Sequence, residues 1–233
     1  MTFCRRPTGQ GLGRQVDNIT FRVFLFGILA LCHSPLRAYD FSDDSYLAPS
    51  HIFPAWFNVI ERGISEQQLI AQCVQEKSIC PNHLRGLRVV ISRGQELSRK
   101  KQIQLTNRWV NQHQRYRSDR PRTSFFSTNP KRIRQEWSTL IDFLQKGGDC
   151  EDYATSKYLM LRQFGIQPED LRIVIVLDRG KREHHALVAV RQGDSITFLD
   201  IDNRIYKKLP SIYRSVYSIN ENAIWDHDQP SKV

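Results

Sequence analysis

The sequence predicts an α+β fold in which a helical N-terminal lobe packs on a C-terminal antiparallel β-sheet. Residues 39–145 carry apolar side chains at helical intervals among many Gln, Arg and Lys residues. After Gly165 the period changes to two, and short runs rich in β-branched residues are typical of strands. A Gly-Asp pair between two of these runs predicts a hairpin, which makes that part of the sheet antiparallel.

The first 38 residues are predicted to be a secretory signal. Several arginines precede the apolar run at residues 23–32, and the small residue Ala38 ends the segment. The run is shorter than the roughly 20 residues that a membrane-spanning helix needs. Leu36 stands where a cleavage site usually has a smaller residue, so an uncleaved membrane anchor is the alternative. Residues 39–233 then form the mature chain.

The chain is basic, with a formal net charge of +10. Removing residues 1–38 leaves 29 basic and 23 acidic residues, a net charge of +6. The basic residues are spread along the chain in short runs, which is typical of a solvated face. Nucleic-acid binding is not predicted, because no basic stripe interleaved with stacking aromatic residues is present in the sequence.

Export bears on how the cysteines are interpreted. Cys4 and Cys32 lie in the predicted signal. Cys73 and Cys80 could pair in an oxidising compartment or remain two half-buried thiols, and their spacing fits both. Cys150 is left over in either case, which makes it a candidate reactive thiol.

Two helices are predicted at residues 64–74 and 96–116, followed by a loop rich in Ser, Thr and Pro at residues 121–130. A short helix is predicted around residues 137–144, ended by the glycine pair at residues 147–148.

A further helix is predicted to begin at Asp149, whose side chain can cap the first turn, and to end at Gly165. Cys150 then lies in the first helical turn, where the helix dipole lowers the pKa of a thiol. The neighbouring Asp149, Glu151 and Asp152 oppose this effect, because negative charge favours the protonated thiol. The acids therefore raise the question of what neutralises them.

Three strands are predicted at residues 171–177, 184–191 and 196–202. Gly193 and Asp194 suit a two-residue type II′ turn between the last two strands. Gln192 then faces Ser195, and the numbers of paired residues sum to 387.

This register selects one histidine and one aspartate. His185 is predicted to face Asp202 on the same side of the sheet, within hydrogen-bonding reach. His184 points to the other face, and Asp200 is predicted to lie opposite Leu187. A histidine held by a carboxylate is a good general base, so Cys150 and this pair would supply the parts of a thiol hydrolase. A surface His–Asp pair with a structural cysteine is the alternative.

A group of short motifs resembles the bacterial transglutaminase-like cysteine proteases, whose best-known members are the LapG-type periplasmic proteases. The resemblance covers most of the mature chain and is strongest from residue 137 to residue 225. Its motifs are WST at residues 137–139, GDCEDYA at 148–154, HALV at 185–188, LDIDN at 199–203 and the tail YSINENAIW at 217–225.

The resemblance implies a papain/transglutaminase-like fold for residues 39–233, as a single protease domain. Its mainly helical part is residues 39–148, its catalytic helix residues 149–165 and its β-rich part residues 166–233. By the same resemblance, Cys150 is the nucleophile, His185 the base and Asp202 the residue that orients the base.

The resemblance further implies calcium beside the nucleophile, on Asp149 and Glu151. Asp152 is a weaker candidate ligand, because its helical position also suits capping. Calcium is a hard cation that takes several oxygen ligands, and its charge would offset the acids next to the thiol.

The family's activity implies a substrate, a partner and a location. Its members cleave very large secreted adhesins near the N-terminus at paired alanines in the periplasm, which disperses biofilm. An inner-membrane receptor for cyclic di-GMP sequesters the protease. Trp137 is a candidate contact for this receptor, with a core position as the alternative, whereas Trp56 and Trp109 are predicted to be core residues.

Two other functions fit the same residues. A transglutaminase-type acyl transferase would form the same acyl-enzyme and differ only in its acceptor. A non-catalytic domain that docks to a membrane receptor is the second alternative, and the presence of Cys150, His185 and Asp202 argues against it.

Overall fold

The computed structural model describes residues 39, 41–42, 44–117 and 137–227. The predicted signal at residues 1–38 and the predicted loop at residues 121–130 lie outside these ranges. Within the described ranges, no helix has the length and apolar character needed to span a membrane.

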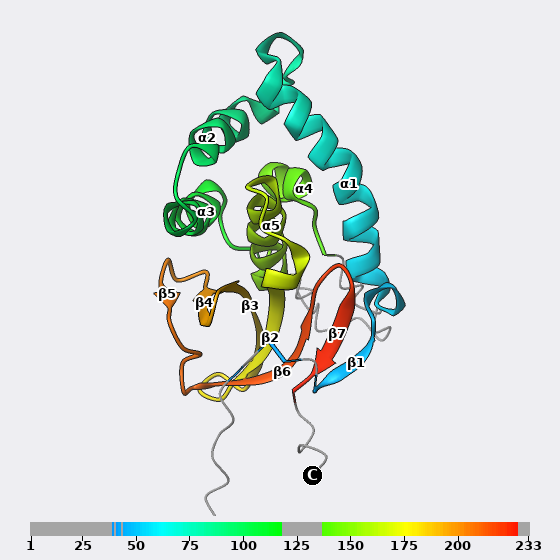
Figure 1. Ribbon diagram of the computed structural model, residues 1–233, viewed down its shortest axis with the longest axis vertical. Helices are drawn as coiled ribbons and strands as arrows, with labels where there is room; N and C mark the ends of the chain where they lie inside the picture. Colours follow the sequence, from blue (N-terminus) through cyan, green and yellow to red (C-terminus); the bar gives the residue numbers. More distant parts are fainter. Residues whose placement is uncertain (1–38, 40, 43, 118–136, 228–233) are drawn as a thin grey trace, which may run out of the picture. The chain divides into compact units, whose positions relative to one another are not determined.

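The predicted antiparallel sheet is confirmed (Figure 1). Seven strands in the described residues follow the order β1-β7-β6-β2-β3-β4-β5, and each neighbouring pair is antiparallel. One strand, β1, comes from the part of the chain that was predicted to be mostly helical. The strands are β1 (Tyr46–Pro49), β2 (Leu171–Asp178), β3 (Glu183–Gln192), β4 (Ser195–Leu199), β5 (Ile205–Tyr206), β6 (Tyr213–Ile219) and β7 (Ala223–Asp226).

The α-helices lie on one side of this sheet, and α5 packs directly on it (Figure 1). The predicted helix at residues 96–116 is shorter than expected, and a separate helix precedes it. The helices are α1 (Pro54–Gln75), α2 (Arg85–Gln95), α3 (Arg99–His113), α4 (Leu140–Lys146) and α5 (Cys150–Gln163), with short 3₁₀ turns η1 (Ser50–Ile52), η2 (Lys77–Ile79), η3 (Asn82–Leu84) and η4 (Pro168–Asp170).

Helix α5 lies at the centre of the core. Every residue from 152 to 161 is buried, and the helix packs on β2 and β3 as well as on α1, α3 and α4. Tyr158, Leu159 and Met160 are at most 1% exposed, and complete burial of an apolar side chain contributes about 1.5–3 kcal/mol. The position of Cys150, the first residue of α5, is therefore fixed by the core.

The opposite face of the sheet is covered by a smaller apolar cluster that includes Tyr39 and Phe41. The guanidinium of Arg172 lies 3.5 Å from the ring centroid of Trp225 and 4.7 Å from that of Phe41. Arg172 also donates a hydrogen bond to the Phe41 carbonyl. These cation–π and hydrogen-bond contacts attach the start of the described chain to the sheet.

The predicted hairpin between β3 and β4 is confirmed. Gln192 pairs with Ser195, and the register continues without a shift to Val188 opposite Leu199. Gly193 has a φ of 57°, as the first central residue of a type II′ turn requires.

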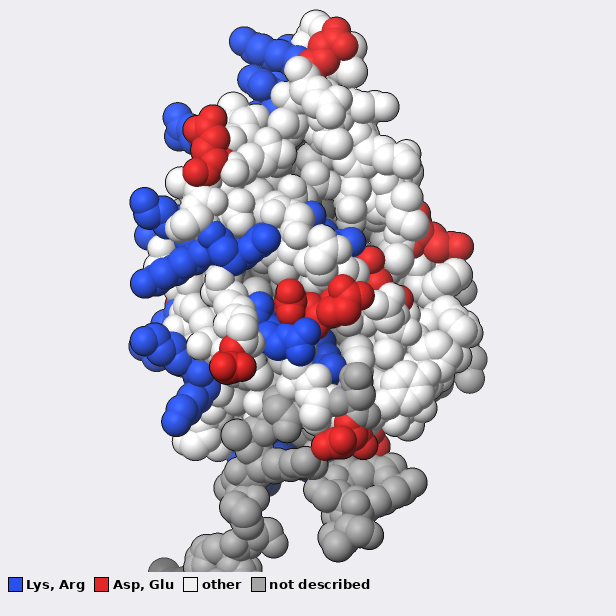
Figure 2. Space-filling view, in the orientation of Figure 1, with Lys and Arg blue, Asp and Glu red and all other residues white. Residues whose placement is uncertain are grey.

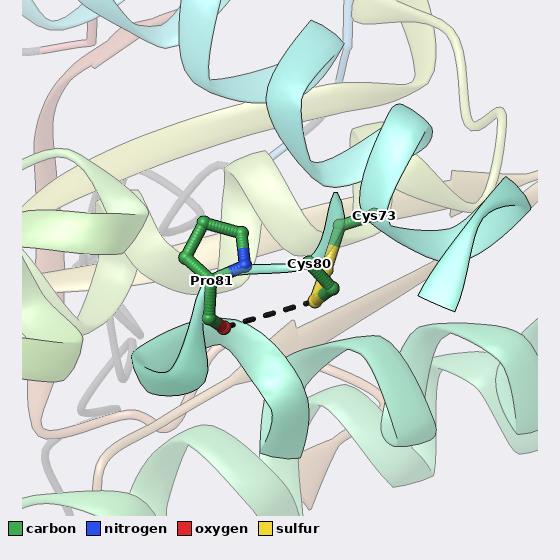
Figure 3. The surroundings of a disulfide bond; sticks show 3 residues. All are labelled: Cys73, Cys80 and Pro81. Carbon is green, nitrogen blue, oxygen red and sulfur yellow. Dashed lines mark hydrogen bonds between the residues drawn. A yellow bond between two sulfur atoms is a disulfide. The ribbon is translucent and has the colours of Figure 1, made fainter. Parts of the chain in front are cut away.

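Cys73 and Cys80 form a disulfide, so the pairing left open by their spacing is present in the structure (Figure 3). The bond joins the end of α1 to the segment before η3, and both cysteines are almost fully buried. The sulfur of Cys80 lies 3.8 Å from the carbonyl oxygen of Pro81.

The positive charge gathers on the side of the domain that carries α2 and α3 (Figure 2). Arg85, Arg93, Lys101 and Arg108 are exposed there, and Glu96 is the single acid between residues 85 and 113. Basic residues that are dispersed in the sequence therefore produce a positive potential on one side of the fold.

Replacing both Cys73 and Cys80 by alanine is expected to lower the free energy of unfolding by about 2–3 kcal/mol, because the crosslink restricts the unfolded chain. Denaturant unfolding with and without a reducing agent measures this. The reducing agent should destabilise the wild-type protein and leave the double variant unchanged. Equal stability of the reduced and oxidised wild-type protein would show that the disulfide contributes nothing.

Candidate active site

Cys150 is the first residue of α5, as predicted, and Asp149 is the N-cap residue. The carboxylate of Asp152 accepts hydrogen bonds from the backbone N–H groups of Asp149, at 3.1 Å, and Ser138, at 2.7 Å. Gly148 allows this close approach, since a Cβ atom there would collide with Asp152. The sequence GDCED therefore sets the helix start and places the thiol in the first turn.

The thiol of Cys150 is half-buried and is the free cysteine among the described residues. It donates a hydrogen bond of 2.9 Å to Oε2 of Glu151. Burial raises the pKa of the Cys150 thiol far above its ordinary value, and the charges of Glu151 and Asp149 raise it further. The backbone N–H of Ala186 acts in the opposite direction. The protein atoms alone thus keep this thiol protonated.

The acids beside Cys150 form a compact group. Asp149, Cys150 and Glu151 each offer a ligand atom within 4.8 Å of the others. Burial opposes ionisation of Glu151, but hydrogen bonds with Asp149 and Cys150 and the charge of His185 lower its pKa overall. Two carboxylates held this close suit a hard divalent cation, whereas the sulfur does not. The donor set therefore fits calcium on Asp149 and Glu151.

His185 lies on β3, next to Ala186, whose backbone N–H faces the sulfur of Cys150. Its Nε2 atom is 2.7 Å from Oδ1 of Asp200, and its side chain is 14% exposed. His184, in contrast, is exposed. The structure therefore brings His185, and not His184, to a carboxylate beside the start of α5.

The predicted pairing of His185 with Asp202 is wrong, and Asp200 takes that place. Strand β4 ends at Leu199, so the register does not extend to Asp202. The chain turns over the next residues, and Asn203 has a φ of 67°. Asp202 is exposed. Its carboxylate instead accepts hydrogen bonds from the hydroxyl of Tyr206 and from the backbone N–H of Arg204.

Asp200 can reach His185 because it lies diagonally across from it, two residues before the position directly opposite. Its Oδ1 atom also accepts a hydrogen bond of 2.6 Å from the backbone N–H of Ile201, and its Oδ2 atom accepts one of 3.2 Å from Tyr213. Burial raises the pKa of Asp200, but the hydrogen bonds from His185 and Ile201, together with the charges of His185 and Lys157, lower it overall. Asp200 is thus held ionised and oriented toward the imidazole.

Trp137, the candidate contact for a receptor, is buried in the structure. It is 4% exposed, and its ring packs edge-to-face on Phe53 at 5.3 Å and on Trp56 at 5.9 Å. An interface anchor must reach solvent before binding, so the alternative of a core aromatic holds. Trp56 is also in the core, as predicted. Trp109 is partly buried and packs against the core.

Asp152 is not placed as a calcium ligand. It is 3% exposed, both of its oxygens accept backbone N–H groups, and it lies outside the group formed by Asp149, Cys150 and Glu151. The capping position that made it the weaker candidate is the position it occupies.

Sequence reasoning missed Asp200 and Tyr213. A signal for Asp200 was present, because the Asp-Asn pair at residues 202–203 is typical of a turn and indicates that the strand ends earlier. No pattern in the sequence connects Tyr213 with the site, since β6 reaches it only through the order of strands in the sheet.

A thiol at a helix N-terminus, next to the strand that carries a histidine held by a buried carboxylate, is the arrangement of a thiol hydrolase. The model of the family described as bacterial transglutaminase-like cysteine proteinase matches residues 65–225. This is more than half of the chain, which therefore belongs to that family and is a cysteine protease.

Two solved structures of LapG from Legionella pneumophila share the fold. The calcium-bound form is 22% identical, with a TM-score of 0.55 over 72% of this chain and 92% of that chain. The EGTA-treated form is also 22% identical, with a TM-score of 0.54 over 70% and 86%. At 22% identity, this structural similarity establishes that the two proteins share a fold. No curated protein sequence matches the chain.

Asp200→Asn is expected to slow alkylation of Cys150 by iodoacetamide roughly tenfold or more, because the imidazolium that accompanies the thiolate loses its carboxylate. The matched variant Asp202→Asn should react at the wild-type rate. Mass spectrometry of the modified protein over time measures both, without requiring a substrate. A slow Asp202→Asn and a normal Asp200→Asn would restore the original register-based assignment.

Proposed function

We propose that this protein is a calcium-dependent periplasmic endopeptidase that cleaves the N-terminal region of a large cell-surface adhesin at a di-alanine-type site. The observation that carries the catalytic part is that the backbone N–H of Ala186 faces the Cys150 sulfur, while the adjacent His185 forms a 2.7 Å pair with Asp200, in a chain of a cysteine proteinase family. The substrate and location rest on the motif resemblance.

In the proposed reaction His185 takes the proton of the Cys150 thiol as the sulfur attacks the scissile carbonyl carbon. His185 then gives that proton to the leaving amine, and an acyl-enzyme remains. A water molecule, deprotonated by His185, attacks the thioester and releases the acid product and the thiol. Asp200 stabilises the imidazolium that forms in each half of the cycle.

Asp149 and Glu151 would hold the calcium ion. Bound there, the ion would supply positive charge that offsets the two carboxylates beside the thiol. The close approach of these carboxylates supports the assignment, as does the calcium-bound form of the Legionella protein.

The partners follow from the same proposal. Release of the adhesin would disperse biofilm, and an inner-membrane cyclic di-GMP receptor would sequester the protease. The basic, apolar and small-residue order of residues 1–38 supports export. The buried Trp137 does not supply the receptor contact, which would use other residues.

Cleavage of an adhesin N-terminal fragment is expected to be lost in Cys150→Ala and in His185→Ala, since each removes a group that makes or breaks a bond. His184→Ala is the matched control and should retain activity, because His184 is exposed and is not the histidine bonded to Asp200.

Gel analysis of the fragment measures cleavage, and a labelled amine added to the reaction detects acyl transfer. Cutting by Cys150→Ala would overturn the nucleophile assignment. Incorporation of the amine in place of cleavage would favour a transglutaminase-type activity.

Calcium is expected to raise the melting temperature, because a ligand that binds only the folded state adds about 2.7 kcal/mol of stability at a hundredfold excess over its dissociation constant. A chelator should reverse this and abolish cleavage. The Asp149→Asn/Glu151→Gln variant should lose the calcium-dependent shift. Glu61→Gln, which removes an exposed acid of α1, should keep it. If the chelator changes neither the melting temperature nor the cleavage activity, the proposed calcium site is wrong.

A further inference from the structure

Lys157 is a charged residue in the middle of the core. It lies on α5, two turns after Cys150, and is 1% exposed. Its Nζ atom donates a hydrogen bond of 2.8 Å to the main-chain carbonyl of Asp200. The ammonium group therefore reaches from the helix that carries the nucleophile to the residue that holds the catalytic histidine.

The same carbonyl has a second donor. Nδ2 of Asn111, on α3, donates to the Asp200 carbonyl oxygen, also at 2.8 Å. Two side chains from two helices thus converge on one peptide oxygen, at the point where β4 has ended. The Asp200 backbone N–H donates to the Arg204 carbonyl at 3.4 Å, and the two side-chain donors satisfy the Asp200 carbonyl oxygen, which lies beyond the end of the strand.

A buried ammonium is costly unless it has suitable partners. Burial lowers the pKa of Lys157 to about 7, although the charges of Asp200 and Asp202 act in the opposite direction. The charges of these two aspartates are thus the ones that favour the ammonium form. An apolar residue of similar length would fill the space without this cost, so the interaction with Asp200 is the specific contribution of the lysine.

We propose that Lys157, assisted by Asn111, is a positioning residue that orients the Asp200 carboxylate toward His185 by holding the Asp200 main-chain carbonyl. This inference rests on the proposed function of Asp200. The carboxylate is then fixed from both sides: its backbone by α3 and α5, and its side-chain oxygens by Ile201 and Tyr213. Helix α5 thereby positions the nucleophile at its first residue and, two turns later, the carboxylate that orients the base.

The test is a double-mutant cycle between Lys157→Met and Asp200→Asn, with cleavage of the adhesin fragment in calcium as the readout. Lys157→Met is expected to lower kcat roughly tenfold or more and to change KM less than about twofold, because the substrate-binding surface is untouched. In the Asp200→Asn background the same change should have almost no effect on kcat, since there is no carboxylate left to orient.

Asn111→Ala is the second variant, because it removes the other donor from a partly buried position. It should lower kcat in the same direction by a smaller factor. Arg162→Met is the matched control: Arg162 is a cation of α5 that donates to a backbone carbonyl and to Glu221, away from Asp200. It should lower the melting temperature and leave kcat unchanged.

The proton on Nε2 of His185 provides a signal that is independent of turnover. Its downfield resonance in ¹H NMR should shift or disappear in Lys157→Met and persist in Arg162→Met. Additive losses of kcat in the cycle, or an unchanged resonance, would overturn the positioning role. If Asp200→Asn itself keeps full activity, the proposed function of Asp200 fails, and that outcome is distinct from failure of the Lys157 inference.

Discussion

The packing of the first turn of α5 against β3 is the constraint on which the site depends. The helix is buried from residue 152 to residue 161, so its start cannot move without disturbing the core. Asp152 fixes that start by accepting two backbone N–H groups. Because Ala186 faces the sulfur of Cys150, His185 follows at the neighbouring position of the strand. A helix–sheet contact thus places the nucleophile beside the strand that carries the base.

The prediction from sequence was most accurate where local rules determine the structure. The start of the α5 helix, the Gly193 turn and the β3–β4 register each depend on a few adjacent residues. The sheet followed from the period-two runs, whereas the family was indicated by the resemblance of its short motifs. The spacing of Cys73 and Cys80 could not decide whether they form a disulfide. Pairing depends on where α1 ends relative to Cys80, which only the structure shows.

The errors at the site arose where a local rule was extended beyond its range. A register identifies neighbours only while the ladder lasts, and β4 ends three residues before Asp202. Asp200 was on the correct face and was rejected because it was not directly opposite His185. The diagonal contact of Asp200, the Tyr213 hydroxyl and the donors on α3 and α5 are brought together by tertiary packing. The periodicity of the sequence does not predict such contacts. Trp137 shows the same limit, since only its packing on Phe53 and Trp56 reveals its burial.

The electrostatics of the two halves of the site differ in a way that explains the proposed metal. Around His185, Asp200 is stabilised as an anion by backbone and hydroxyl donors, and a buried lysine lies behind it. Around Cys150, the nearby charges are Asp149 and Glu151, and both raise the pKa of the thiol. The helix start favours a thiolate but does not overcome burial and two acids. A divalent cation on those acids would reverse their effect, so the same residues that suppress the nucleophile without metal would permit it with metal.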